Sequence, residues 1–257
     1  MFQYIKNRLG SSMRVARSRL RLIEQQSAEE KTFCFVVATR LPESKFWKQS
    51  PTGRSFQKLQ GKSNVRLHIH HNNKKGLGEV YAAELMNEDS DYIVFLHDDV
   101  WLMDENLLEI IHADLSVADI IGVAGTRHRH PRQPAWLFSK VSTGGGFVWD
   151  YPNLSGSVGH GDSQRHEFTN YGSVGQRCKL LDGVFMAMNT KRVKQSEVNF
   201  SKEFDFHFYD MDFCRSADRQ GLWMKTSNIR LIHSSSGAFG TESWWNGYRK
   251  YLSVWGS

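Results

Sequence analysis

Apolar runs alternate with amphipathic segments over the first half of the chain. Runs with the pattern of buried or half-buried strands stand at 33–39, 65–71, 92–96 and 120–124. Segments with helical periodicity lie between them, at 45–60 (interrupted by Pro51 and Gly53), 79–87 and 107–115. Because parallel strands need crossover connections, this alternation predicts an α/β fold with a mostly parallel sheet flanked by helices.

The pattern differs beyond residue 125. Residues 126–178 carry His, Arg, Gly, Ser and Trp with little periodicity, which predicts long loops around a site. An apolar strand-like run at 180–188, a short helix at 213–220, one or two strands within 223–232 and an aromatic helix at 244–255 follow. A chain of 257 residues has room for one α/β domain with short extensions, and we assign that domain to residues 31–257.

Residues 1–30 have a pattern of their own. Apolar residues recur every three or four positions from Phe2 to Ile23, and lysines and arginines fill much of the remaining surface. This spacing predicts a basic amphipathic helix followed by a linker. Such a helix either binds an anionic membrane surface, here through residues 1–24, or packs on its own domain or on a second subunit. The sequence leaves both interpretations open.

Composition narrows the class of protein. The net charge of +6 suits an anionic partner, and the predicted strands carry no aromatic–basic RNA-binding motif, so we expect no nucleic-acid partner. Three cysteines without a CxxC pair predict reduced thiols and no cysteine-based zinc site. No run of about 20 apolar residues occurs, and the first residues are too charged for a secretory signal. We therefore expect a cytoplasmic protein, peripheral at the inner membrane face if residues 1–24 bind there.

Three segments place polar residues at the ends of predicted elements. In the first, YIVFLHDDV (92–100), the strand ends in His97, Asp98 and Asp99. Ligands of open parallel sheets bind beyond the carboxyl ends of the strands. Carboxylates at that edge suit Mg²⁺ or Mn²⁺, which commonly complete their coordination with substrate phosphates. The alternative is that an aspartate caps the helix that follows.

The other two segments come late in the chain. FDFHFYDMDFCRSADRQG (204–221) carries Asp210 and Asp212 just before the predicted helix. One carboxylate is a candidate general base, and the other is a candidate ligand of an acceptor hydroxyl or a helix cap. IHSSSG (232–237) places His233 after a short strand, as a candidate metal ligand. Together the three segments have the groups of one metal–phosphate site.

These segments, with LLDGVFMAMN (180–189), resemble an inverting glycosyltransferase of family 2 over about residues 33–256. The resemblance implies the GT-A (Rossmann-like) fold, a divalent cation (Mn²⁺ or Mg²⁺) and a nucleotide-diphospho-sugar donor. HDD occupies the place of the family's DxD motif, which implies that Asp99 binds the metal together with His233. FYDMD occupies the place of its E-D-x-D segment, which implies that Asp210 is the catalytic base.

The resemblance also implies a donor site. Its residues are Thr39 and Arg40 after the first strand, Asn72 and Asn73 after the second, His97 and Asp98 in the HDD segment, and Asp182 and Gly183 in the DG segment. The sequence departs from the family pattern where His97 replaces the first Asp of DxD and Tyr209 replaces the Glu of E-D-x-D. Asp98 is a candidate substitute for that missing carboxylate. The family's Asp-Asp-Gly-Ser after the second strand, which contacts the nucleobase, is absent.

The acceptor side has three candidates. Arg127 and Trp136 lie in the segment after the fourth predicted strand, and Asp212 accompanies Asp210; a solvated basic loop is the alternative for Arg127. The implied reaction moves a sugar, with inversion, from a nucleotide diphosphate to a hydroxyl of a glycan or lipid-linked acceptor. UDP is the expected nucleotide, and surface polysaccharide or lipopolysaccharide synthesis is the implied pathway.

Two other classes share some of these features. A sugar nucleotidyltransferase also places acidic metal ligands on an α/β sheet, but residues 38–42 (ATRLP) lack the glycine-rich phosphate loop that it normally shows. A non-catalytic carbohydrate-binding protein of the same fold would share the basic charge and the 12% aromatic content. The released product separates the three classes: a nucleoside diphosphate, pyrophosphate, or neither.

Overall fold

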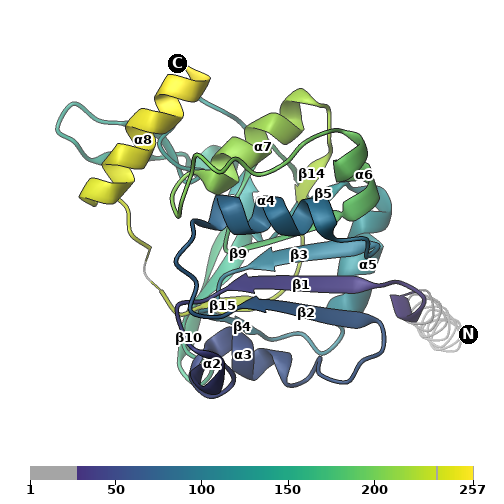
Figure 1. The fold of residues 1–257 in the computed structure, drawn as a ribbon. Coiled ribbons are helices and arrows are strands. Elements are labelled where there is room, and N and C mark those ends of the chain that lie inside the picture. Colours follow the sequence, from purple (N-terminus) through teal and green to yellow (C-terminus); the bar gives the residue numbers. More distant parts are fainter. Residues whose placement is uncertain (1–27, 236, 257) are drawn as a thin grey trace, which may run out of the picture.

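The computed structural model describes residues 28–235 and 237–256 (Figure 1). The predicted amphipathic helix, including the proposed membrane-binding residues 1–24, lies outside these residues. In the part of the chain that the structure describes, no helix is long and apolar enough to cross a bilayer.

A mixed seven-stranded sheet forms the centre of the domain (Figure 1). Its strands are, in spatial order, β11 (Arg177–Cys178), β14 (Met224–Thr226), β5 (Ile120–Gly122), β13 (Phe185–Asn189), β3 (Tyr92–Leu96), β1 (Phe33–Ala38) and β2 (Val65–His70). The pairings of β1 with β2 and β3, and of β5 with β14, are parallel, as predicted. The apolar runs of β1 and β3 form the central strands because the sheet buries both of their faces.

One strand enters this sheet in the opposite direction. The apolar run at 180–188 is not one strand, because the chain turns at residues 182–184 between β12 (Leu180–Leu181) and β13. β13 therefore runs antiparallel to both of its neighbours, β3 and β5. The α/β prediction is confirmed, but the parallel pairings within the central sheet are limited to the three named above.

Helices cover both faces of the central sheet. They are α2 (Glu43–Gln49), α3 (Pro51–Phe56), α4 (Leu77–Asn87), α5 (Leu107–Val117), α6 (Thr190–Gln195), α7 (Tyr209–Arg219) and α8 (Glu242–Trp255). Tyr81 of α4 packs on Phe95 of β3, whereas His112 of α5 packs on Tyr92 of the same strand. Because residues three apart on a strand point to opposite faces, α4 and α5 sandwich the sheet.

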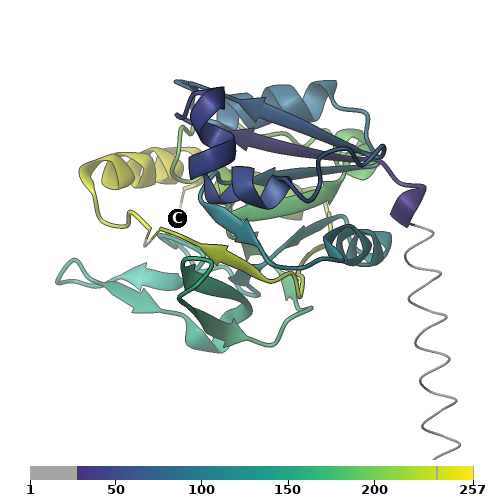
Figure 2. The same cartoon turned by 90° about the horizontal axis from the view of Figure 1, so that it is seen from below.

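A second sheet lies beside the first (Figure 2). It joins β12, β6 (Ala124–Thr126), β9 (Leu154–Gly161), β15 (Leu231–His233) and β4 (Val100–Leu102), and β10 (His166–Gly172) pairs with β9. A separate hairpin consists of β7 (Phe138–Val141) and β8 (Phe147–Trp149). The 3₁₀ turn η1 (Tyr151–Asn153) precedes β9.

The prediction that residues 126–178 are loops is therefore wrong. The strands escaped notice because most β10 side chains are exposed and β9 is rich in Gly and Ser, so neither segment forms an apolar run.

Two helices begin at residues other than those predicted, and both differences affect the residues near the cleft. α7 begins at Tyr209, four residues before the predicted start, so Asp210 and Asp212 lie in its first turn rather than before it. Segment 45–60 divides at Ser50 into α2 and α3, and Ser50 Oγ accepts a hydrogen bond from the amide of Gly53. Pro51 begins α3 instead of interrupting a helix, since the first helical position needs no amide donor.

Candidate active site

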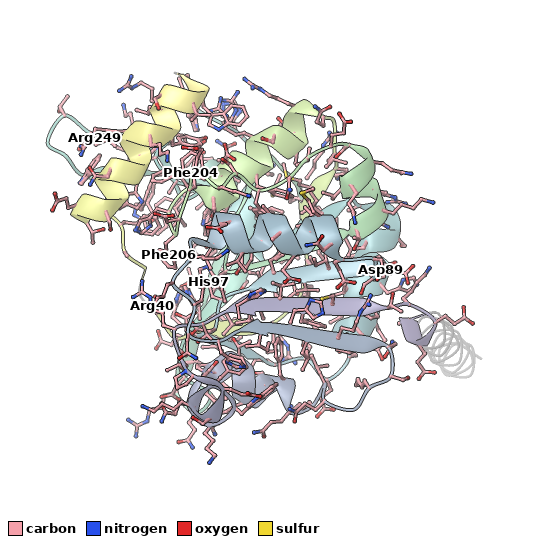
Figure 3. All side chains as sticks on the ribbon, in the orientation of Figure 1. Arg40, Asp89, His97, Phe204, Phe206 and Arg249 are labelled. Atoms are coloured by element: carbon pink, nitrogen blue, oxygen red, sulfur yellow. The ribbon has the colours of Figure 1, made fainter. Side chains whose placement is uncertain are left out.

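A cleft of about 1280 Å³ opens beyond the carboxyl ends of β1, β2 and β3. Arg40, His97 and Phe206, from three separate segments, lie together at this edge of the sheet (Figure 3). Eleven of the residues selected from the sequence line the cleft: Thr39, Arg40, Asn72, Asn73, His97, Asp98, Asp99, Trp136, Asp182, Asp210 and His233. Segments separated by almost 200 residues thus meet in one cavity.

Three selected residues do not line it. Gly183 lies directly behind the wall, and its amide donates to Asp210 Oδ2 at 3.0 Å. Asp212 is buried and accepts a hydrogen bond from Trp255 Nε1 at 2.7 Å, so its carboxylate anchors α8 to α7 and is turned away from an acceptor. Arg127 is exposed and donates to the carbonyl of Pro152 at 2.6 Å. The acceptor-binding role predicted for Asp212 and Arg127 is therefore not supported.

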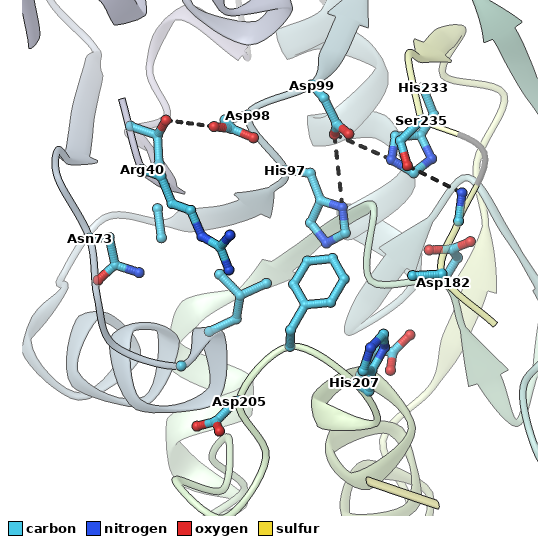
Figure 4. A pocket seen from close by; sticks show the side chains of 18 of the residues that line it. Arg40, Asn73, His97, Asp98, Asp99, Asp182, Asp205, His207, His233 and Ser235 are labelled. Carbon is cyan, nitrogen blue, oxygen red and sulfur yellow. Dashed lines mark hydrogen bonds and ion pairs between the residues drawn. The ribbon is translucent and has the colours of Figure 1, made fainter. Parts of the chain in front are cut away.

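His97, Asp99 and His233 converge at the centre of the cleft (Figure 4). One candidate ligand atom from each lies within 4.8 Å of the other two. Asp99 Oδ1 is 3.2 Å from His233 Nε2 and 4.0 Å from His97 Nδ1. His97, which the sequence assigned to donor binding, thus belongs to the same group as the two predicted metal ligands.

The hydrogen bonds of Tyr209 select the tautomer of His97. The Tyr209 hydroxyl donates its single proton to the carbonyl of Gly183 at 2.9 Å. Its oxygen also lies 2.9 Å from His97 Nε2, and must accept there because its proton is already used. The imidazole therefore carries its proton on Nε2 and turns the lone pair of Nδ1 toward Asp99. A bond that fixes the far nitrogen of a histidine in this way is typical of metal-binding histidines.

The electrostatics of His97 and Asp99 suit a cation. Burial lowers the pKa of His97, which keeps the imidazole neutral and able to act as a ligand. Burial raises the pKa of Asp99, but attraction to His233 and His97 outweighs it, and the net pKa of this carboxyl lies below its ordinary value. Burial lowers the pKa of His233, but attraction to Asp99 outweighs it and raises the net pKa, so a bound cation would take the place of the His233 proton. Asp99 Oδ1 is buried without a hydrogen bond of good geometry. A buried, ionised oxygen of this kind is the ligand that a divalent cation satisfies.

Replacing Tyr209 by Phe is expected to weaken Mn²⁺ binding by about 10–100-fold, because His97 loses the acceptor that orients it. Isothermal titration of the full chain with Mn²⁺ measures the effect. Tyr81→Phe is the matched control, since the Tyr81 hydroxyl is also buried on the α4 face but donates to the carbonyl of Leu96. Equal Mn²⁺ affinity in both variants would show that Tyr209 does not position His97.

Asp210 lies at the wall of the cleft under the first turn of α7. Its two oxygens accept the amides of Gly183 at 3.0 Å and Met211 at 2.8 Å. Burial, followed by repulsion from Asp182, raises the pKa of Asp210 to about 7. Asp182 is held in place because its carboxylate accepts Trp136 Nε1 at 2.9 Å and the amide of Val184 at 2.8 Å. A carboxyl with a pKa near neutrality is suited to proton transfer.

The loops after β1, β2 and β3 hold one another at the opposite wall. Thr39 Oγ1 donates to Asp98 Oδ2 at 2.5 Å, and the amide of Asn73 donates to the carbonyl of Thr39 at 2.8 Å. Asn72 adopts a left-handed backbone conformation, with φ of 51°, which lets the chain turn directly after β2. Arg40 and Lys75 bring positive charge to the same wall.

Two residues that sequence reasoning missed position the HDD segment. Ser50 Oγ donates to the carbonyl of Asp98 at 2.5 Å, and Thr52 Oγ1 donates to the carbonyl of His97 at 2.7 Å. Both lie at the start of α3, more than 40 residues before the segment that they hold. No local signal marks them, because their role depends on how α3 packs beside β4.

Comparison with known proteins agrees with the geometry. The sequence model of a family described as "glycosyltransferase like family" matches residues 57–235, and the chain belongs to this family. No curated protein sequence matches the chain. The predicted resemblance to glycosyltransferases is thereby confirmed at the level of the family.

Solved structures with a similar fold include TarS and a mannosyltransferase. Staphylococcus aureus TarS 1–349 shares 12% identity at a TM-score of 0.44, over 87% of this chain and 64% of that one. The same fragment in complex with UDP-GlcNAc matches 87% of this chain and 66% of its own, again at 12% identity and a TM-score of 0.44. A mannosyltransferase, PcManGT from Pyrobaculum calidifontis, in complex with GDP-Man and Mn²⁺, shares 8% identity at a TM-score of 0.45, over 88% and 65%. This chain spans about two thirds of the length of these proteins.

Proposed function

We propose that this chain is a metal-dependent, inverting glycosyltransferase. It moves a sugar from a nucleotide-diphosphate donor to a hydroxyl of a glycan or lipid-linked acceptor. The observation that carries the proposal is that one cleft contains both the group His97–Asp99–His233 and the raised-pKa carboxyl of Asp210. The first suits a cation beside a diphosphate, and the second suits removal of a proton from an acceptor hydroxyl.

The donor occupies the wall formed by the loops after β1 and β2. Arg40 supplies positive charge for the diphosphate, and Thr39 and Asn73 line the wall that faces the nucleoside. Mn²⁺ or Mg²⁺ bound by His97, Asp99 and His233 would neutralise charge on the departing diphosphate. This mixed nitrogen and oxygen group favours Mn²⁺, since Mg²⁺ prefers oxygen ligands alone.

Asp210 is the general base of the proposed reaction. In its ionised form it takes the proton of the acceptor hydroxyl, whose oxygen attacks the anomeric carbon from the face opposite the leaving diphosphate. A single displacement of this kind inverts the configuration. Asp182, the neighbouring carboxylate, is engaged by Trp136 and by the amide of Val184, so it serves to raise the pKa of Asp210 rather than to attack the sugar.

We further propose UDP as the donor nucleotide and bacterial surface polysaccharide or lipopolysaccharide synthesis as the pathway. The enzyme then works in the cytoplasm, and residues 1–24 hold it at the inner membrane face. These assignments rest on the family resemblance of the sequence and on the basic, amphipathic spacing of the first residues.

A panel of nucleotide sugars tests the donor assignment. With Mn²⁺ present, the correct donor at about 100 times its Kd is expected to stabilise the fold by about 2.7 kcal/mol, or roughly 5–10 °C in Tm. EDTA should abolish that shift, and incubation with acceptor should release the nucleoside diphosphate. Pyrophosphate as the product would favour a nucleotidyltransferase. A folded sample that no donor stabilises would contradict the proposal.

A further inference from the structure

A second cluster of potential metal ligands lies at the opposite end of the sheet from the cleft. Cys34, His68 and Glu88 each place one ligand atom within 4.8 Å of those of the other two. Cys34 is the second residue of β1, whereas Thr39 follows the last, so the cluster and the cleft are about 16 Å apart along the strand. Asp89, next to Glu88, marks this end of the molecule (Figure 3). The proposed transferase reaction uses none of these residues.

The register of the strands explains how the cluster forms. Cys34 pairs with Arg66 and Val36 with His68, in the parallel ladder of β1 and β2. Residues that pair across a ladder point to the same face, as do residues two apart, so Cys34, His68 and His70 share one face. That face is covered by α4, which carries Glu84 in its last turns and ends at the C-cap residue Glu88. Strand and helix therefore direct thiol, imidazole and carboxylate groups toward each other.

The ligand atoms of the cluster are close enough to share one ion. His68 Nδ1 lies 3.8 Å from Glu88 Oε2 and 2.7 Å from Glu84 Oε2, and Glu84 Oε1 lies 2.8 Å from His70 Nε2. Ligand atoms around tetrahedral Zn²⁺ are about 3.3–3.8 Å apart, which matches the distance from His68 to Glu88. Glu84, which now contacts His68 at hydrogen-bond distance, would move away from it to supply the fourth ligand. His70, hydrogen-bonded to the other oxygen of Glu84, would hold that carboxylate in place.

The two oxygens of Glu88 have different surroundings. Oε1 accepts the amides of Asp89 and Ser90, the Ser90 hydroxyl, and the guanidinium of Arg66. The Glu88 carboxylate also accepts a hydrogen bond from the Cys34 thiol, and its Oε2 lies 3.8 Å from His68 Nδ1. The Glu88 side chain is only 2% exposed, so water has little access to it. Thiol, imidazole and buried carboxylate therefore lie close together.

The charges favour a divalent cation here. The ionised forms of Cys34, Glu84 and Glu88 carry three negative charges, and the one nearby positive charge, Arg66, is shared with the exposed Asp89. A divalent ion would offset most of this negative charge. Burial and the adjacent Glu88 raise the pKa of the Cys34 thiol, so without a cation it keeps its proton. On coordination the thiol proton passes to solvent and the sulfur bonds to the metal, as coordinated thiols do.

We propose that Cys34 Sγ, His68 Nδ1, Glu84 and Glu88 Oε2 form a structural Zn²⁺ site that ties the edge strand β2 to β1 and α4. Mixed sulfur, nitrogen and oxygen ligands in a closed tetrahedral arrangement suit Zn²⁺ better than Mg²⁺ or Mn²⁺. The His68 side chain is 40% exposed, which provides a path for the ion to enter. The proposal departs from the sequence-based expectation of no cysteine-based zinc site. That expectation rested on the lack of a CxxC pair, whereas here strand register brings one cysteine together with ligands from other segments.

Co²⁺ binding to the full chain tests the proposal. Thiolate-bound Co²⁺ absorbs strongly in the near ultraviolet, and the catalytic group His97–Asp99–His233 contains no sulfur, so that band reports only on the Cys34 cluster. We expect the band in the native chain, its loss when one equivalent of Zn²⁺ is added, and its absence in Cys34→Ser. Cys178→Ser is the matched control, because Cys178 is also a buried, free thiol but lies outside the cluster; it should keep the band.

A second variant keeps the test informative if Cys34→Ser misfolds. His68→Asn changes a half-exposed position on an edge strand, so it should fold even if Cys34→Ser does not. It is expected to weaken Zn²⁺ binding at least about tenfold and to remove the rise in Tm that Zn²⁺ gives the native chain. The proposal is overturned if the native chain shows no thiolate band, or if the band survives in both Cys34→Ser and His68→Asn. Either result would identify the cluster as a metal-free hydrogen-bond network and would leave the transferase proposal untouched.

Discussion

Replacing Asp210 by Asn is expected to lower kcat by about 10²–10⁴-fold, the usual contribution of a general base, while donor binding persists. The amide keeps the size of the carboxylate and can still accept the Gly183 amide, but it takes up no proton. Turnover is measured as nucleoside diphosphate released in the presence of acceptor, and donor binding as the rise in Tm. Asp212→Asn is the matched control, since its side chain lies two residues away but accepts from Trp255 outside the cleft. Near-native turnover in Asp210→Asn would reject Asp210 as the base.

The pH dependence gives an independent check on the same residue. Because the pKa of Asp210 is raised to about 7, the base is ionised only above that pH, and kcat/KM should rise with pH through a midpoint near 7. The effect on stability has the opposite sign. A folded-state pKa above the ordinary value of 3.8 means that the free energy of unfolding contributed by this group is lost as pH rises from about 4 to about 7. The Asn variant should lack both dependences.

Replacing Asp99 by Asn is expected to reduce kcat/KM by about 10³-fold, or about 4 kcal/mol, through loss of the metal. The amide keeps an oxygen ligand but removes the negative charge that lies 3.2 Å from His233 Nε2. Activity should then respond weakly to Mn²⁺, whereas the native enzyme should lose activity in EDTA and regain it when Mn²⁺ is restored. Steady-state rates across a Mn²⁺ titration measure both effects.

A control separates this result from a general effect of removing a carboxylate. Asp162→Asn changes an exposed carboxylate in the turn between β9 and β10, where the amide oxygen can still accept the amides of Gln164 and Arg165. It should leave the Mn²⁺ response unchanged. Native-like activity of Asp99→Asn at low Mn²⁺ would remove Asp99 from the metal site.

Buried strands were the part of the fold that the sequence predicted best. The apolar runs at β1 and β3 coincide with the structure because a strand buried on both faces must be apolar along its whole length. β9 and β10 were missed for the converse reason, since Gly and Ser in one strand and exposed polar residues in the other leave no apolar period. α7 was placed four residues late because Tyr209 and Met211 belong to its buried side, while the two aspartates between and after them read as a polar loop.

The sequence by itself determined which chemical groups the cleft contains. HDD, DG, FYDMD and IHS each stand at the end of a strand or the start of a helix, and chain direction alone places such positions at one edge of a sheet. Only the tertiary structure decided which role each of these groups can have. Packing of α7 against β12 turned Asp210 into the cleft and Asp212 away from it, and Tyr209 joined His97 to the candidate metal ligands through a hydrogen bond across 112 residues. Such pairings depend on register and packing between distant segments, which no local pattern encodes.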